Sequence, residues 1–191
     1  MLRILLVNDT DKPIAEMRQA LAQQGYEVLN AVATPHALLK VVEGERPDVV
    51  IIDTESPSRD TLEQLAVMSS AAPRPVVMFT HDADQQLIRA AVGAGVTAYV
   101  VDGLSAERLA PVIEVALARF AEETRLRSRL AEVEQQLADR KLIDRAKGVL
   151  MDKRSMSEAQ AYETLRNQAM KQGSRLADVA RQIIAMADLL G

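Results

Sequence analysis

A glycine interrupts the densest group of basic side chains in this 191-residue sequence. The stretch RAKGVLMDKRSMSEAQ, residues 145–160, surrounds Gly148 with four cations: Arg145, Lys147, Lys153 and Arg154. Because glycine is about 1 kcal/mol less favourable than alanine in a helix interior, helix propensity does not account for Gly148. We therefore expect another group, either a ligand or a neighbouring helix, to approach the backbone closely at this position.

A second set of candidate residues follows the short apolar runs of the amino-terminal half. They are Asn8, Asp9, Asp53, Thr80 and Asp102. In open parallel sheets ligands bind beyond the carboxyl ends of the strands, and carboxylate oxygens are the ligands that hard cations such as Mg²⁺ prefer. We therefore expect these side chains to gather at one edge of a sheet. The alternative is that they are only polar residues at the starts of loops.

The rest of the sequence offers little catalytic chemistry. It has no cysteine, which excludes disulfides, thiolate catalysis and cysteine-ligated zinc. His36 and His81 are the only histidines, and neither has a partner at a spacing typical of an active site, so we expect structural roles for both. Because we find no nucleophile motif, glycine-rich phosphate loop or metal-ligand cluster, we predict that the protein is not an enzyme.

The elements that would position these residues alternate between strands and helices. Apolar runs predict five buried strands, at residues 3–7, 27–32, 48–53, 76–80 and 98–101. Helical stretches with glycine or proline near their ends separate these runs. This order predicts an α/β fold with a five-stranded parallel sheet and helices on both of its faces.

No strand pattern returns after Ser105, and residues 106–151 predict one long helix or two continuous ones. Four apolar residues within it are spaced as a short heptad seam: Leu126, Leu130, Val133 and Leu137. We predict that this seam forms a coiled coil in a homodimer. The alternative is that the helix packs on its own domain.

Two short helices close the sequence. Ser157 and Gln160 form a capping-box pattern at the start of the first. Three of its residues are expected to face inward: Tyr162, Leu165 and Ala169. An apolar stripe over residues 176–190 predicts the second. With the end of the long helix, the two predict a three-helix bundle.

Charge divides the chain into two parts. Residues 1–123 carry 10 basic and 18 acidic side chains, a net charge of −8, whereas residues 124–191 carry 13 and 9, a net charge of +4. We expect different partners for the two parts, although a basic excess can also be only a solvated helix surface. The opening MLRILLV is too short for a signal peptide or a membrane span, so we expect a cytoplasmic protein without membrane contact.

The strand ends LLVNDTDKP, VVIIDTESP, VVMFT and AYVVDG resemble those of response-regulator receiver domains. The resemblance implies a flavodoxin-like fold in which Asp53 is the phosphoacceptor and Asp9 and Asp53 hold Mg²⁺. It also implies that Thr80 supplies the hydroxyl that binds the phosphoryl group and that Tyr99 is the switch aromatic.

Two positions depart from the receiver pattern. Asn8 stands for one of the acidic metal ligands, which lowers the negative charge available to a cation. Asp102 stands where the family has a lysine, so a carboxylate would oppose the charge of about −1.5 to −2 that a phosphoryl group carries. We therefore predict a pseudo-receiver that requires no cofactor, binds Mg²⁺ weakly and uses phosphorylation weakly or not at all.

The stretch LIDRAKGVLMDKRSMSEAQAYETLRNQAMKQGSRLADVARQII closely resembles the ANTAR domain, an RNA-binding module of transcription antiterminators. A receiver followed by a coiled coil and an ANTAR domain is similar to the layout of the AmiR and NasT antiterminators. The resemblance implies a receiver-like domain at residues 1–120, a coiled-coil linker at 121–140 and an ANTAR domain at 141–191. It implies binding of stem-loops in a nascent leader transcript, which prevents the terminator from forming.

The same resemblance implies how such a protein is controlled. An inhibitory sensor protein, similar to NasS or AmiC, would hold the antiterminator until a ligand arrives. For NasT-like members the implied process is nitrate or nitrite assimilation. The acidic receiver would then serve as the docking surface for this sensor.

Eight residues are candidates for RNA contact: Arg145, Lys147, Gly148, Met151, Lys153, Arg154, Tyr162 and Arg166. We expect cations to meet phosphates, and unstacked loop bases to meet planar or apolar groups. Two alternatives stay open, since Gly148 could serve only tight helix packing and Tyr162 could belong to the core.

Two other functions compete with RNA binding by an antiterminator. One is a phosphorylation-dependent response regulator of a two-component system, binding RNA or DNA, with the last two helices as a helix-turn-helix. A recognition helix needs polar side chains at its amino end, and residues 174–190 offer few: Arg175, Arg181 and Gln182. This scarcity favours RNA. The other rival is a protein-binding adaptor without any nucleic-acid role.

Overall fold

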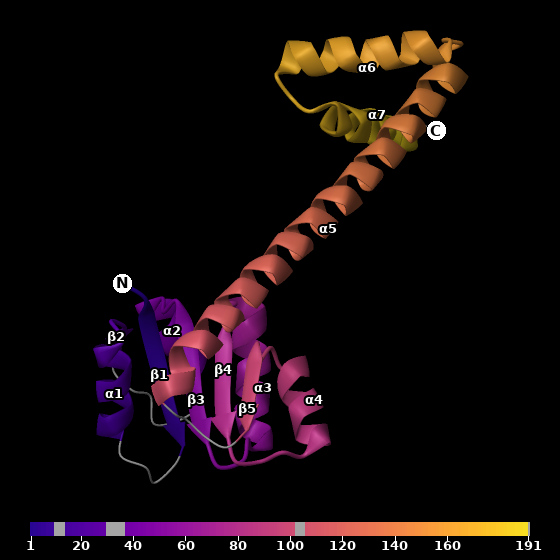
Figure 1. Ribbon diagram of the computed structural model, residues 1–191. Helices are drawn as coiled ribbons and strands as arrows, with labels where there is room; N and C mark the ends of the chain where they lie inside the picture. Colours follow the sequence, from indigo (N-terminus) through magenta and orange to yellow (C-terminus); the bar gives the residue numbers. More distant parts are fainter. Residues whose placement is uncertain (10–13, 30–36, 102–105, 191) are drawn as a thin grey trace. The chain divides into compact units, whose positions relative to one another are not determined.

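The computed structural model describes residues 1–9, 14–29, 37–101 and 106–190. They form two compact units, residues 1–124 and 125–191, each described here by itself (Figure 1). His36 and Asp102 lie outside the described residues, and so does the side chain of Asp9. The expectations for these three side chains therefore stay predictions.

The first unit is built on a five-stranded parallel sheet, which confirms the predicted fold. Its strands are β1 (Arg3–Asp9), β2 (Glu27–Val28), β3 (Val49–Thr54), β4 (Val76–Thr80) and β5 (Ala98–Val101). They lie in the order β2-β1-β3-β4-β5, and each pairs in parallel with its neighbour. β2 spans two residues of the predicted run 27–32, of which residues 30–32 lie outside the described part.

Helices cover both faces of the sheet (Figure 1). α2 (Leu38–Glu45), α3 (Arg59–Ala71) and α4 (Gln85–Gly93) contribute to one apolar core, with β1 side chains such as Leu5. α1 (Ile14–Gln23) and the start of α5 (Ala106–Arg154) contribute to a second core, with the alternate β1 residues such as Ile4. Alternate side chains of a strand point to opposite faces, and burial of each large aliphatic one contributes about 1.5–3 kcal/mol.

The second unit is a bundle of three helices, as predicted. The end of α5 packs with α6 (Glu158–Gln172) and α7 (Leu176–Leu190). The core joins small and large side chains: Ala146, Leu150, Ala161, Leu165, Ala169, Val179, Ala180 and Ile184. Alanine at several of these positions lets the helix backbones approach closely.

The start of α6 follows the predicted capping box. The Ser157 hydroxyl accepts from the Gln160 amide at 3.3 Å, and the Gln160 side chain accepts from the Ser157 amide at 2.9 Å. Leu165 and Ala169 are buried as expected, but Tyr162 is 46% exposed. The prediction that Tyr162 faces inward is therefore wrong, because Ala161 occupies the buried position of that turn.

Among the described helices, none is both long and apolar enough to cross a bilayer.

Gly95, in the turn between α4 and β5, offers a test of this fold. Its φ is +100°, and a Cβ there would lie 2.6 Å from the Ser69 Cβ on α3. We expect Gly95→Ala to lower the free energy of unfolding by about 2 kcal/mol or more, because backbone strain and a steric clash add. Gly93→Ala is the matched control, since a Cβ there meets nothing within 4 Å. Urea unfolding of both variants that gave equal losses would contradict this packing.

Candidate phosphoacceptor pocket and nucleic-acid interface

The carboxyl ends of the central strands bring three of the predicted pocket residues to one edge of the sheet. Asn8 pairs with Asp53 in the register of β1 and β3, and Thr80 ends the neighbouring β4. All three are buried, with at most 8% exposed. The structure thus brings these three buried polar side chains to one edge, as expected from the sequence, and their role in a shared site stays a prediction.

The hydroxyl groups of this edge are engaged by loop atoms. Thr80 Oγ1 donates to the Glu55 carbonyl at 2.7 Å and accepts from the Asp82 amide at 3.1 Å. Tyr99 donates from its hydroxyl to the Asp82 carbonyl at 2.9 Å. Burial, more than any other cause, raises the pKa of Tyr99 above its ordinary value. Sequence reasoning missed Asp82, which lies two residues beyond Thr80.

Two of the oxygen ligands expected for a divalent cation are described at this edge. They are one carboxylate, Asp53, and one amide, Asn8. Mg²⁺ in proteins is often held by one or two carboxylates, waters and phosphate oxygens. Among the described side chains, no three His, Cys, Asp or Glu residues converge as a metal site. The weakened Mg²⁺ site at Asp9 and Asp53 stays a prediction.

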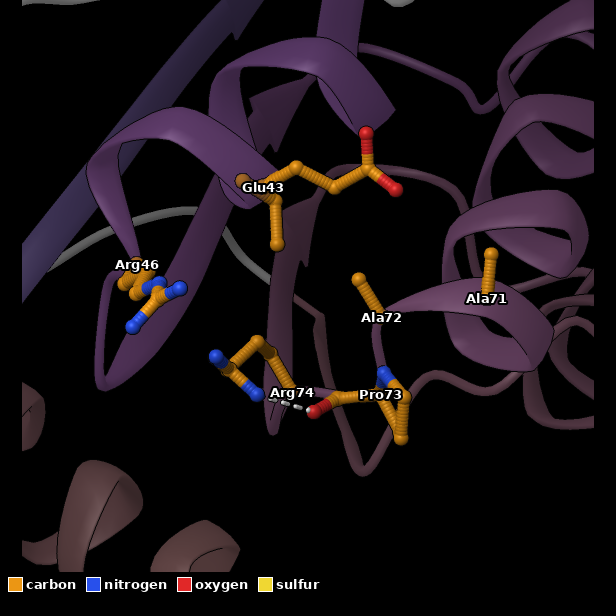
Figure 2. Close-up of a pocket in the computed structure, with 7 residues that line it drawn as sticks. Glu43, Arg46, Ala71, Ala72, Pro73 and Arg74 are labelled. Atoms are coloured by element: carbon orange, nitrogen blue, oxygen red, sulfur yellow. Dashed lines mark hydrogen bonds between the residues drawn. The ribbon is translucent and has the colours of Figure 1, made fainter.

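A charged hollow of about 510 Å³ lies elsewhere in the first unit (Figure 2). Arg46 at the end of α2, Arg74 just before β4, and Glu43 line it. Arg74 donates to the Pro73 carbonyl at 2.8 Å. Both arginines lie where α2 and α3 end, and the carbonyl ends of helices favour cations. The positions of the two arginines therefore agree with the ends of these helices, and no ligand is assigned to this hollow.

Gly148 lies in an open hollow of about 470 Å³ in the second unit. The hollow is lined by α5 residues and one α6 residue: Arg140, Asp144, Lys147, Gly148, Met151 and Glu158. A Cβ built on Gly148 meets no other group within 4 Å. Among the described residues no other helix occupies the space beside Gly148, so within the chain the alternative that Gly148 serves tight helix packing is wrong.

Lys147 joins α5 to the start of α6. Its Nζ lies 2.8 Å from Asp144 Oδ1 and 2.7 Å from Glu158 Oε1, and the side chain is only 16% exposed. The hydrogen bond to Asp144, followed by the one to Glu158, raises the pKa of Lys147. The hydrogen bond from Lys147 lowers the pKa of Asp144. The hollow is thus lined by two basic and two acidic side chains, whereas the sequence around Gly148 predicts a basic surface.

The other predicted cations do not share one face. Arg145 forms an ion pair with Asp188 of α7 at 3.3 Å, and Lys153 donates to the Ala187 carbonyl at 3.2 Å. Arg154 and Arg166 are exposed. The structure therefore divides the cations between the α7 side of α5 and the open surface around α6.

Tyr162 lies on α6 one turn after Glu158, and Arg166 follows one turn later. Residues four apart are neighbours on a helix surface, so these side chains continue from the rim of the Gly148 hollow along α6. The exposure of Tyr162 and Arg166 makes an aromatic ring and a guanidinium accessible beside the hollow.

Three residues of the hollow were missed from the sequence: Arg140, Asp144 and Glu158. Arg140 and Asp144 precede Gly148 at intervals of four residues, which is a helical signal that could have found them. Glu158 lies on another helix and gives no such signal.

The heptad seam on α5 is exposed. Leu126, Leu130, Val133 and Leu137 are between 53% and 59% accessible. Within the described part of the chain they are not covered by their own domain, so the alternative that this stretch of helix packs there is wrong.

Comparison with known proteins identifies a known domain in each half of the chain. Residues 4–114 match the response regulator receiver domain, and residues 131–184 match the ANTAR domain. The transcriptional regulatory protein PdtaR of Mycobacterium tuberculosis is 31% identical over 182 residues, which is 95% of this chain and 89% of that protein. The nitrate regulatory protein of Klebsiella oxytoca is 39% identical over 64 residues, 34% of this chain and 16% of that protein.

Solved structures agree on the first unit. A CheY-like receiver domain protein from Methanospirillum hungatei superimposes with a TM-score of 0.56 and 26% identity, over 64% of this chain and 98% of that one. A receiver domain from a Desulfovibrio desulfuricans diguanylate cyclase, at 23% identity, has the same fold with a TM-score of 0.56 over 64% of this chain and 99% of that one. With an amino-terminal receiver and a carboxyl-terminal ANTAR domain, this chain belongs to the response regulators.

Proposed function

We propose that the protein is an RNA-binding transcription antiterminator, which binds stem-loops in nascent leader transcripts and prevents terminator formation. The match to the ANTAR domain supports this proposal. The similarity to PdtaR, which is described as a transcriptional regulatory protein, supports a regulatory role and not an enzymatic one.

The hollow at Gly148 is the observation that carries the proposal. It is open, it lies on the bundle and its backbone is bare of a side chain. A flat base that has left its stack in a hairpin loop needs this kind of surface, whereas a duplex presents only groove edges. Met151, 39% exposed, adds an apolar surface at the rim.

The charges of the surface indicate different places for the bases and the phosphates of the RNA. Asp144 and Glu158 repel phosphate but can accept hydrogen bonds from the amino and imino groups of a base. Phosphates are better served by the exposed cations Arg154 and Arg166. Tyr162 between them offers a ring for stacking. We therefore assign bases to the hollow and phosphates to its surroundings.

A homodimer would cover the exposed seam on α5. With Leu126 and Val133 at d positions and Leu130 and Leu137 at a positions, the flanking e and g residues have complementary charges in a parallel pair. Glu122 would meet Arg127 of the partner subunit, and Arg129 would meet Glu134 of the partner subunit. This charge pattern supports a parallel, in-register coiled coil.

Control of the antiterminator is assigned to the receiver. Its net charge of −8 offers a docking surface for an inhibitory sensor protein, similar to NasS or AmiC, in the cytoplasm. The likeness of part of the chain to a nitrate regulatory protein supports nitrate or nitrite assimilation as the process. Asn8 and Asp102 support control without an essential role for phosphate or Mg²⁺.

A phosphorylation-dependent regulator of RNA or DNA is the second candidate, favoured by the buried Asp53 and Thr80 at the strand ends. DNA binding through α7 is less well supported. Arg175 and Arg181 both form ion pairs with Asp178 at 3.1 Å, which reduces the positive charge that this helix presents.

Gly148→Ala separates binding from folding. The methyl group enters open space, so we expect the free energy of unfolding to rise by about 0.5–1 kcal/mol. The same methyl group fills part of the hollow, so affinity for the leader hairpins of neighbouring genes should fall about tenfold or more, as misfit in a close contact costs 1–3 kcal/mol. Gly44→Ala in α2, also in open space, is the control for which affinity should not change. Unchanged hairpin binding by Gly148→Ala would remove the hollow from the interface.

The phosphate contacts are tested by salt dependence. Arg154→Ala and Arg166→Ala should each weaken hairpin binding and reduce the slope of log affinity against log salt by about one. Lys147→Met should instead lower the stability of the bundle, because Asp144 and Glu158 then lack their shared cation. Slopes measured by filter binding that stayed at the wild-type value in both arginine variants would place the phosphates elsewhere.

The coiled coil is tested by sedimentation equilibrium. We expect Leu130→Lys to yield monomers because two lysines would face each other at an a position, whereas the neighbouring Ala131→Lys, on the outer surface, should stay dimeric. Arg129→Glu should weaken the dimer and the added Glu134→Arg should restore it. This parallel seam would be contradicted if Leu130→Lys stayed dimeric. It would also be contradicted if Arg129→Glu with Glu134→Arg dimerised no better than Arg129→Glu alone.

A further inference from the structure

The loops that follow β3 and β4 are fastened to each other by hydrogen bonds. The Glu55 carbonyl in the first loop accepts from Thr80 Oγ1 at 2.7 Å and from the His81 amide at 3.3 Å. Ser56 Oγ, in the same loop, donates to Asp82 Oδ2 at 2.8 Å. Two segments 26 residues apart in sequence are thus held side by side.

Asp82 is the centre of these bonds. Its Oδ1 accepts from the Asp84 amide at 2.9 Å, and its carbonyl accepts from the Tyr99 hydroxyl at 2.9 Å. Its amide donates to Thr80 Oγ1 at 3.1 Å. The amide, the carbonyl and both carboxylate oxygens of Asp82 are therefore engaged, by partners on two loops, at the end of β4 and on β5.

These bonds restrain the two side chains that a receiver would need to move. The Thr80 proton is directed to the Glu55 carbonyl, so a phosphoryl group on Asp53 would have to replace that bond to use it. Tyr99 is restrained through the Asp82 carbonyl. A change in the hydrogen bonds of Ser56 or Asp82 therefore affects those of Thr80 and Tyr99, because hydrogen bonds in a network strengthen one another.

We propose that Asp82 and Ser56 form a latch that holds Thr80 and Tyr99 in one arrangement, and that opening of this latch switches the receiver. Asp82 is only half-buried and Ser56 is exposed, so a docked protein can reach the latch from solvent. The latch makes the arrangement of Thr80 and Tyr99 depend on contacts between the two loops. This inference is independent of RNA binding by the other domain.

Amide hydrogen exchange on the full chain tests the latch through Ser56→Ala. Ser56 makes no bond to the amides of Asp82 or Asp84, which donate to Thr80 Oγ1 and Asp82 Oδ1. We expect both amides to exchange about fivefold faster in Ser56→Ala, the change that loss of one ordinary hydrogen bond produces in a local opening equilibrium. Asp82→Ala should accelerate amide exchange more strongly than Ser56→Ala, and along both loops.

Glu55→Gln is the matched control. It removes one negative charge beside Ser56 but keeps the backbone carbonyl that Thr80 and His81 use. Its exchange rates should equal those of the wild type, and amides of β1 and β3 should stay protected in all variants. Wild-type rates in Ser56→Ala, or equal acceleration in Glu55→Gln, would overturn the latch. If Asp82→Ala fails to fold, Ser56→Ala still decides, because it removes a single exposed hydroxyl.

Discussion

The ion pairs of Lys147 are the interaction on which the shape of the Gly148 hollow depends. One ammonium group lies within 2.8 Å of a carboxylate on its own helix and of another on the next helix. A cation with two close carboxylates stays charged, and its hydrogen bonds orient both acids toward the same space. This contact sets the start of α6 against α5 beside Gly148, and so it shapes the hollow that we assign to RNA bases.

The same contact explains why the predicted basic notch is not simply basic. Two carboxylates balance two cations that line the hollow, whereas the exposed Arg154 and Arg166 do not line it. In the function that we propose, this surface separates bases from phosphates by charge, because acceptors beside a bare backbone suit a base edge and exposed cations suit the sugar-phosphate chain. Affinity and selectivity can then be tuned by different residues.

In the amino-terminal half, the candidate residues lie at the ends of buried strands. Its central strands are buried on both faces, so only their carboxyl ends and the loops beyond them are free to act. Asp53 and Thr80 lie at those ends, but the hydroxyl of Thr80 is engaged by the neighbouring loop. The latch that we propose would let this receiver report loop contacts made by another protein.

Local sequence determined the strands, the long helix, the capping box at Ser157 and the bundle, because periodic burial and cap chemistry depend on residues that are close along the chain. It also placed Asn8, Asp53 and Thr80 at one edge, since parallel strands align their carboxyl ends. Tertiary structure decided the rest. Whether Tyr162 is buried, that Glu158 is the second acid bonded to Lys147 and which loop holds Asp82 depend on helices and loops that meet across 11 or more residues. Charge and hydrogen bonding act over a few ångströms of space, whatever the separation along the chain, and for that reason the sequence alone named the cations but not their partners.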